Sequence, residues 1–215
     1  MWKPLLGGFS AALLLTTAAV ADVSATAVTE LNIRSGPGPE FAIIGVMGAG
    51  TTIPVQGCME GSKWCAVLHG GAQGWVYSDY LVADVTGTQV VLTERPAEMA
   101  MPVATYSGPA ATVSGAVGGA IVGALIGGPI GAAIGGTAGA VAGAVIDPSP
   151  EVHTFVTSNP IDPVYLEGEV VVGATVPETV VIAPIPDYEY AYVYVNGVPV
   201  LVEPATRRIV YVFRS

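Results

Sequence analysis

One group of side chains in the first half of the chain combines a positive charge with aromatic rings, a combination that binds ligands. Its cation, Arg34, begins a loop that is rich in glycine and proline and ends at Pro39. Such a loop cannot bury a core, and surface loops beside aromatic residues are common binding sites. We therefore expect a charged donor and stacking faces from six candidate ligand-binding residues: Arg34, Phe41, Trp64, Trp75, Tyr77 and Tyr80.

The same residues also fit a purely structural role. Trp64 and Trp75 could belong to a core, and Arg34 could pair locally with an acid such as Glu40. The sequence leaves both interpretations open.

The two cysteines, Cys58 and Cys65, lie on either side of a predicted hairpin turn over residues 59–63. Opposed strand positions place β-carbons about 4.5–5.5 Å apart, within reach of a disulfide after modest adjustment. The spacing is not that of a redox motif, and two cysteines without clustered histidines do not make a zinc site. We predict a structural disulfide.

Residues 26–84 carry the pattern of a small all-β barrel. We expect short strands at 27–33, 41–47, 51–56, 64–69 and 74–76, separated by glycine-containing turns, with residues 78–81 closing the barrel. Short strands at spacings near ten residues are typical of such barrels.

Four motifs in this region resemble the bacterial SH3 domain: LNIRSGPG at 31–38, GVMGAG at 45–50, WCAV at 64–67 and GWVYSDYL at 74–81. The resemblance covers about sixty residues. It implies an SH3-like module that binds cell-wall or peptide ligands, often beside a hydrolase.

Nothing in the chain predicts an enzyme. Wall peptidases that carry this module need a cysteine nucleophile and a histidine downstream of it, but beyond residue 85 there is no cysteine and His153 is the only histidine. We expect His153 to be an exposed loop residue, and Glu167 and Glu169 to be solvated charges on one face of a strand. Phosphate loops, nucleotide fingerprints and metal clusters are absent from the sequence, so we expect no cofactor and no metal.

Residues 85–113 are predicted to be a linker, and residues 114–146 form an uncharged block with a period of four. We expect this block to pack helices through glycine: Gly115, Gly119, Gly123, Gly127, Gly131, Gly135, Gly139 and Gly143. Because four helical residues turn ~400°, eight such glycines drift around a straight helix, so we predict two helices, 114–127 and 130–146, broken at Gly127–Pro129.

These helices would pack closely, as glycine-lined helices do in lipid. The block resembles the glycine-zipper segments of bacterial outer-membrane proteins. A single kinked span, a helical hairpin outside the membrane and a flexible linker are the alternatives.

Residues 151–215 are predicted to be a second β domain. We expect strands at 169–173 and 179–182, then a hairpin of 190–195 with 198–202 around Asn196-Gly197, then a strand at 208–213. Asn-Gly favours a two-residue turn, which would place Val195 opposite Val198 and Tyr192 opposite Leu201. Both faces of this hairpin are then apolar, so we expect one face to cover the domain and the other to meet a partner or a second copy.

Four alternating tyrosines at 188, 190, 192 and 194 would share one face of the hairpin. They could form an aromatic strip for sugar or peptide stacking, or they could pack a core. The segment from Gly173 to Val180 and that from Val195 to Val210 resemble a C-terminal domain of unknown function in exported alphaproteobacterial proteins. That resemblance implies no activity.

The amino terminus predicts export. Lys3, an apolar run and the small residues Ala19-Val20-Ala21 indicate a signal peptide over residues 1–21, with an uncleaved anchor as the alternative. The net charge of −10 argues against nucleic acid and anionic lipid as partners.

Together these features predict a mainly β protein: an SH3-like barrel, a Gly/Ala-rich helical hairpin and a C-terminal β-meander. We expect a non-catalytic protein of the periplasm or cell envelope of a Gram-negative bacterium. Its barrel would bind cell wall or a wall-linked peptide, and its glycine block would hold a membrane. The alternative is an oligomerising assembly or membrane-perturbing protein that uses the barrel as an adaptor.

Overall fold

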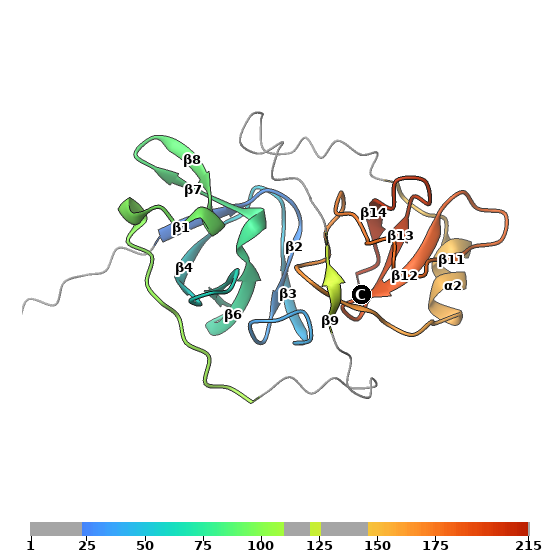
Figure 1. Ribbon diagram of the computed structural model, residues 1–215, viewed down its shortest axis with the longest axis horizontal. Helices are drawn as coiled ribbons and strands as arrows, with labels where there is room; N and C mark the ends of the chain where they lie inside the picture. Colours follow the sequence, from blue (N-terminus) through green and yellow to red (C-terminus); the bar gives the residue numbers. More distant parts are fainter. Residues whose placement is uncertain (1–22, 110–120, 126–145, 215) are drawn as a thin grey trace, which may run out of the picture.

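The computed structural model describes residues 23–109, 121–125 and 146–214. These residues form three β-sheets, with an eight-stranded antiparallel sheet in the amino-terminal half and a four-stranded antiparallel sheet in the carboxy-terminal half (Figure 1). A two-stranded sheet lies between them. The mainly β class, the barrel and the C-terminal meander are confirmed.

The barrel sheet has the order β3-β2-β6-β5-β4-β1-β7-β8. Its strands are β1 (Val23–Ala27), β2 (Leu31–Arg34), β3 (Ile43–Met47), β4 (Thr52–Cys58), β5 (Trp64–His69), β6 (Ala72–Tyr77), β7 (Leu81–Val85) and β8 (Thr88–Val91). The single strand expected at 27–33 is two strands, because the chain bends at 28–30, where Val28 donates to the Tyr80 carbonyl. Residues 78–80 form a 3₁₀ turn at the point predicted to close the barrel.

The described part of the segment predicted as a linker, residues 85–109, instead packs on the barrel. After β8 come 3₁₀ turns at Leu92–Glu94 and Ala97–Met99, and then residues 100–109, which we call the strap. The Cys58 amide donates to the Pro102 carbonyl and the Ala104 amide donates to the Cys58 carbonyl, both at 2.9 Å. These bonds fix the strap along the outside of the barrel (Figure 1).

Six residues of the glycine block are described, 121–125 and Ile146, and they are not helical. Strand β9 (Ile121–Ala124) pairs in parallel with β10 (Tyr165–Glu167), and the Leu125 amide donates to the Glu167 carbonyl. The helix predicted over 114–127 is therefore wrong at these residues, and Gly123 lies in a strand. β-Branched Ile121 and Val122 favour a strand, while glycine costs roughly 1 kcal/mol per helical position relative to alanine.

The other seven glycines of the period, the second predicted helix and the signal peptide lie outside the described residues. Within the described ranges, no helix has the length and apolar character that crossing a bilayer requires.

The C-terminal domain contains helix α2 (Pro150–Ser158) and a meander of β11 (Ala183–Pro184), β12 (Ala191–Val195), β13 (Val198–Val202) and β14 (Ile209–Val212). The predicted hairpin register is confirmed, with Val195 opposite Val198 and Tyr192 opposite Leu201. The strands expected at 169–173 and 179–182 are wrong. Residues 168–182 form turns and loops apart from one bridge at Thr175, because Gly173 adopts a positive φ and Pro177 has no amide to donate.

The second face of the hairpin is covered by the chain itself, not by a partner or a second copy. Val152 and Val156 of α2 pack against Tyr192, Leu201 and Phe213. The Tyr192 and Tyr194 hydroxyls donate to main-chain carbonyls at the carboxyl end of α2. Core packing therefore accounts for these two tyrosines, while half-buried Tyr188 and Tyr190 stack edge-to-face at 5.5 Å.

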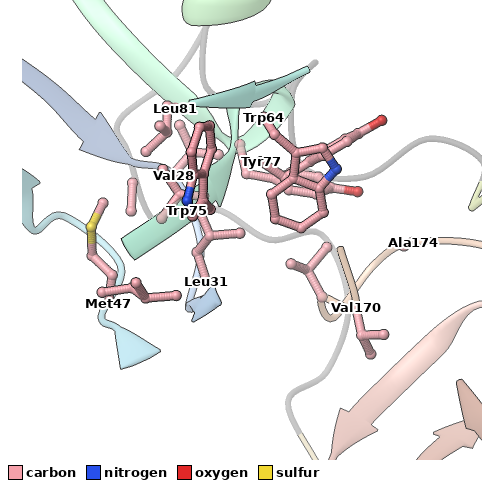
Figure 2. Packing of buried hydrophobic residues seen from close by; sticks show 14 of the residues in the cluster. Val28, Leu31, Met47, Trp64, Trp75, Tyr77, Leu81, Val170 and Ala174 are labelled. Carbon is pink, nitrogen blue, oxygen red and sulfur yellow. The ribbon is translucent and has the colours of Figure 1, made fainter. Parts of the chain in front are cut away.

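The first face of the hairpin shares one hydrophobic core with the barrel. Val193, Val200 and Val202 belong to the same buried cluster as Leu31 and Trp75. Figure 2 shows the same continuity through the loop after β10, whose Val170 and Ala174 join the cluster on the side of Trp64 and Tyr77. The two domains therefore have a common interior.

A buried ion pair crosses this common interior. Arg34 on β2 donates from Nε and Nη2 to the two carboxylate oxygens of Glu169, and both side chains are no more than 1% exposed. Asn32 and the Val170 amide also donate to the Glu169 carboxylate, each at 2.9 Å. Glu169 was expected to be solvated, and a local acid such as Glu40 was the alternative partner considered for Arg34. Both are wrong, because folding brings together residues 135 positions apart.

We predict that Glu169→Gln destabilises the protein by about 3–5 kcal/mol, because it leaves the buried Arg34 charge without its counterion. Urea unfolding measures this change. Glu167→Gln is the matched control: this carboxylate is exposed at the end of β10, two residues before Glu169, and its replacement should change stability by less than about 0.5 kcal/mol. Equal effects of the two substitutions would contradict a structural role for the ion pair.

The predicted disulfide is confirmed. Cys58 on β4 and Cys65 on β5 are directly paired, with their Cα atoms 3.9 Å apart, and both are buried. The strap bonds to the backbone of Cys58, so the bridge also supports the strap.

Replacing both cysteines with alanine should lower the free energy of unfolding by about 2.5 kcal/mol, the chain-entropy value for so short a loop. Thermal unfolding of the oxidised, reduced and substituted proteins measures the loss. A reduced protein as stable as the oxidised one would show that the bridge does not stabilise the hairpin.

Candidate functional site

The six candidate ligand-binding residues are brought together by the barrel, but five of them face its interior. The exposed fractions are 1% for Arg34 and Trp75, 2% for Tyr80, 4% for Trp64 and 5% for Tyr77, and Phe41 is half-buried. Trp64 and Trp75 are core residues, as the structural interpretation proposed. In this arrangement the five buried side chains cannot contact a ligand.

Two segments of the chain cover this aromatic surface. Tyr106 of the strap packs edge-to-face against Phe41 and Trp75, with ring centroids 5.3 and 5.8 Å away. On another side, the loop after β10 packs over Tyr77, so closely that a β-carbon on Gly168 would lie 3.9 Å from the ring. The face predicted to bind a ligand is therefore occupied from within the molecule.

The buried tyrosines of this surface are not acid–base groups at physiological pH. Burial raises the pKa of both Tyr77 and Tyr80 well above the ordinary value of 10.0, and the neighbouring carboxylate of Asp79 adds to the rise. Both hydroxyls remain protonated and can only act as neutral hydrogen-bonding groups.

An open concavity lies elsewhere, at the junction of the two domains. It has a volume of about 520 Å³, and we call it the junction groove. Asn32, Ile43, Ile44 and Val46 of β2 and β3 line one wall; His153, Thr157, Pro199, Phe213 and Arg214 of the C-terminal domain line the other.

The barrel wall of the groove is apolar and exposed. Ile43, Ile44 and Val46 are 39%, 43% and 43% exposed. Strand β3 is the last strand of its sheet, so one of its edges is not paired with any described strand. Proteins commonly protect such edges with charge, proline or a β-bulge. Strand β3 contains no charge and no proline, but its register with β2 shifts between Ile43 and Gly45.

The opposite wall supplies the charge of the groove. Arg214 forms an ion pair with Glu30 at 2.5 Å, and its Nε donates to Asn32 over a longer distance, 3.4 Å. Burial lowers the pKa of Arg214, opposed by the charge of Glu30. His153 lies in helix α2 and is half-buried, and its ring packs edge-to-face on Phe213 with the ring centroids 4.7 Å apart. The expectation that His153 is an exposed loop residue is therefore wrong.

No metal-binding cluster is found in the part of the chain that the structure describes. No three side chains among its histidines, cysteines, aspartates and glutamates are placed to hold an ion. Both cysteines are in the disulfide. The described chemistry is that of binding: apolar contact, an arginine and an unpaired strand edge.

Sequence reasoning missed the groove because its walls come from two domains. A signal for the barrel wall was present, since no charge occurs between Glu40 and Glu60 and the apolar residues of β3 fall on both faces of the strand. Nothing in the sequence pairs that strand with Phe213 and Arg214.

Comparisons with known families agree with this architecture. Residues 29–82 match the family model of the bacterial SH3 domain, and residues 155–214 match the model described as Domain of unknown function (DUF1236). No curated protein and no solved structure gives a significant match to the chain. The chain thus contains a region that matches a bacterial SH3 domain, joined through a shared core to a C-terminal region that matches the DUF1236 domain.

Proposed function

We propose that this protein is a non-catalytic cell-envelope protein that binds a cell-wall peptide in the junction groove. A bacterial SH3 domain is a binding module, which supports the general role. The proposed location of the binding site rests on the contrast between two surfaces of the protein. The aromatic face of the barrel is covered by Tyr106 and the loop after β10, while Ile43, Ile44 and Val46 remain exposed beside a concavity.

The charges support a wall ligand over nucleic acid or anionic lipid. Five described cations are engaged within the chain: Arg34 and Arg214 pair with glutamates, Lys63 pairs with Asp79, and Arg95 and Arg207 donate to main-chain carbonyls. The surface therefore offers no basic patch built from these residues. The disulfide suits an oxidising compartment, in agreement with the proposed export.

Membrane association is a second part of the proposal and rests on composition. Between Glu98 and Asp147 the chain carries no charged side chain. Contact with a membrane would then be hydrophobic and insensitive to salt, because screening acts on charges.

For the wall ligand, we expect the full chain to co-sediment with purified peptidoglycan sacculi. Val46→Glu should lower the bound fraction at least about tenfold, because a carboxylate in the apolar wall must be desolvated when a ligand enters. Leu68→Glu is the matched control, since Leu68 is an exposed apolar residue of β5 that does not line the groove. Wild-type protein that stays in the supernatant would overturn the proposed function, and equal binding by Val46→Glu would exclude the groove.

For the membrane, we expect the protein to remain in the membrane pellet after washes in high salt. A chain that lacks residues 126–145 should move to the soluble fraction. Release of the intact protein by salt would argue against hydrophobic association.

A further inference from the structure

We infer that the ligand of the junction groove is a short, extended peptide that ends in a free carboxylate, held by the β3 edge and by Arg214. This inference rests on the proposed function for the site and adds the chemical class of its ligand.

The first step is shape. A concavity of about 520 Å³ is in the size range of sites for small ligands. A whole second domain would instead need a broad complementary surface. The groove runs beside β3, whose five residues extend roughly 16 Å. It therefore suits a chain of a few residues.

The second step is the strand edge. An extended peptide can add to the free edge of a sheet, where main-chain hydrogen bonds give affinity and alternate side chains give specificity. β3 is such an edge among the described strands. The apolar side chains of Ile43, Ile44 and Val46 line the groove on the barrel side, and Pro199 and Phe213 line it on the side of the C-terminal domain. That arrangement selects an apolar ligand side chain.

The third step is charge. The chain has 17 acidic and 7 basic residues, yet the residues that line the groove include one arginine, one histidine and no carboxylate. This local reversal favours an anionic end on the ligand. Glu30, which pairs with Arg214, is the carboxylate that a ligand must share or displace.

Arg214 has the geometry to accept a second carboxylate. A guanidinium carries five N–H donors and suits the two oxygens of a carboxylate. Only the contact with the Glu30 carboxylate is short; the donations from Nε to Asn32 and from Nη2 to the Glu30 carbonyl are 3.4 and 3.3 Å. Weakly used donors beside an open concavity are available for a ligand.

A second copy of the chain is a poorer occupant on the same observations. Its β3 could pair with this edge, but that strand carries no charge and would bring Arg214 no carboxylate in addition to that of Glu30. The groove chemistry therefore favours a carboxylate-terminated peptide.

Two probes test the inference directly: fluorescein-labelled Gly-Val-Ala-Val as the free acid and as the C-terminal amide. Fluorescence anisotropy with the full chain should show the acid binding at least about tenfold more tightly, because hydrogen bonds to a charged group are the stronger ones. Leu68→Glu should bind the acid as the wild type does. Equal affinities for acid and amide, or no binding of either below millimolar concentration, would overturn the inference.

Two further variants separate recognition from folding. Arg214→Gln should remove the preference for the acid. Because this change also removes the pair with Glu30, it is compared with Glu30→Gln, which frees Arg214 and should tighten binding of the acid severalfold. Weaker binding of the acid by Glu30→Gln would contradict the role given to Arg214.

The outcome is distinguishable from that of the sacculus experiment. Tight, acid-selective peptide binding without sacculus binding would overturn the wall function and retain the groove chemistry. Sacculus binding that requires Val46, without any selectivity for the acid, would retain the wall function and overturn this inference. A dimer in sedimentation velocity that Val46→Glu dissociates would make a second copy the occupant and would also overturn it.

Discussion

The contact between Arg34 and Glu169 is the constraint on which the arrangement of the two domains depends. Apolar burial is non-directional, so a shared core of valines and aromatic rings can bring the domains together without fixing their orientation. Two parallel hydrogen bonds from a guanidinium to a carboxylate have one geometry. Asn32 and the Val170 amide also bond this carboxylate and so tighten that geometry.

Once this orientation is fixed, the surfaces divide into two kinds. The loop that carries Glu169 necessarily lies over Tyr77, so the aromatic side of the barrel is buried within the molecule. The strap covers Trp75 by a separate route, since the disulfide hairpin holds its backbone. At the junction of the domains, the seam where β3 meets the end of the C-terminal domain remains open. The groove is therefore a consequence of how the domains are joined and belongs to neither domain alone.

Local patterns of the sequence predicted local structure well. Asn196-Gly197 predicted a hairpin and its register, and the two cysteines around a turn predicted a disulfide. The SH3 motifs predicted most of the barrel strands. Partnerships across the chain were not predictable, because neither Arg34 nor Glu169 carries a local sign of the other. The helix predicted from the glycine period is wrong at 121–124 because of another partnership across the chain. These residues pair with β10, and that pairing outweighs the helical pattern of the local sequence. Helix α2 was missed although Pro150 stands at its start, a favourable first helical position.

The buried ion pair also explains why the candidate ligand residues were misplaced. An arginine beside aromatic rings gives the same sequence pattern whether the carboxylate that it binds belongs to a ligand or to the same chain. In this protein Glu169 supplies that anion from the second domain. Desolvation of the two charges is compensated by donations from Asn32 and the Val170 amide to Glu169, and from Arg34 to the Pro39 and Phe41 carbonyls. The aromatic face of the SH3 domain therefore contacts other segments of the same chain. An external molecule would have to bind residues that the junction leaves exposed. The groove has an arginine of its own, Arg214, which is 20% exposed and shares its carboxylate with solvent. Of the two arginines at the junction, only Arg214 can exchange its partner without separating the domains.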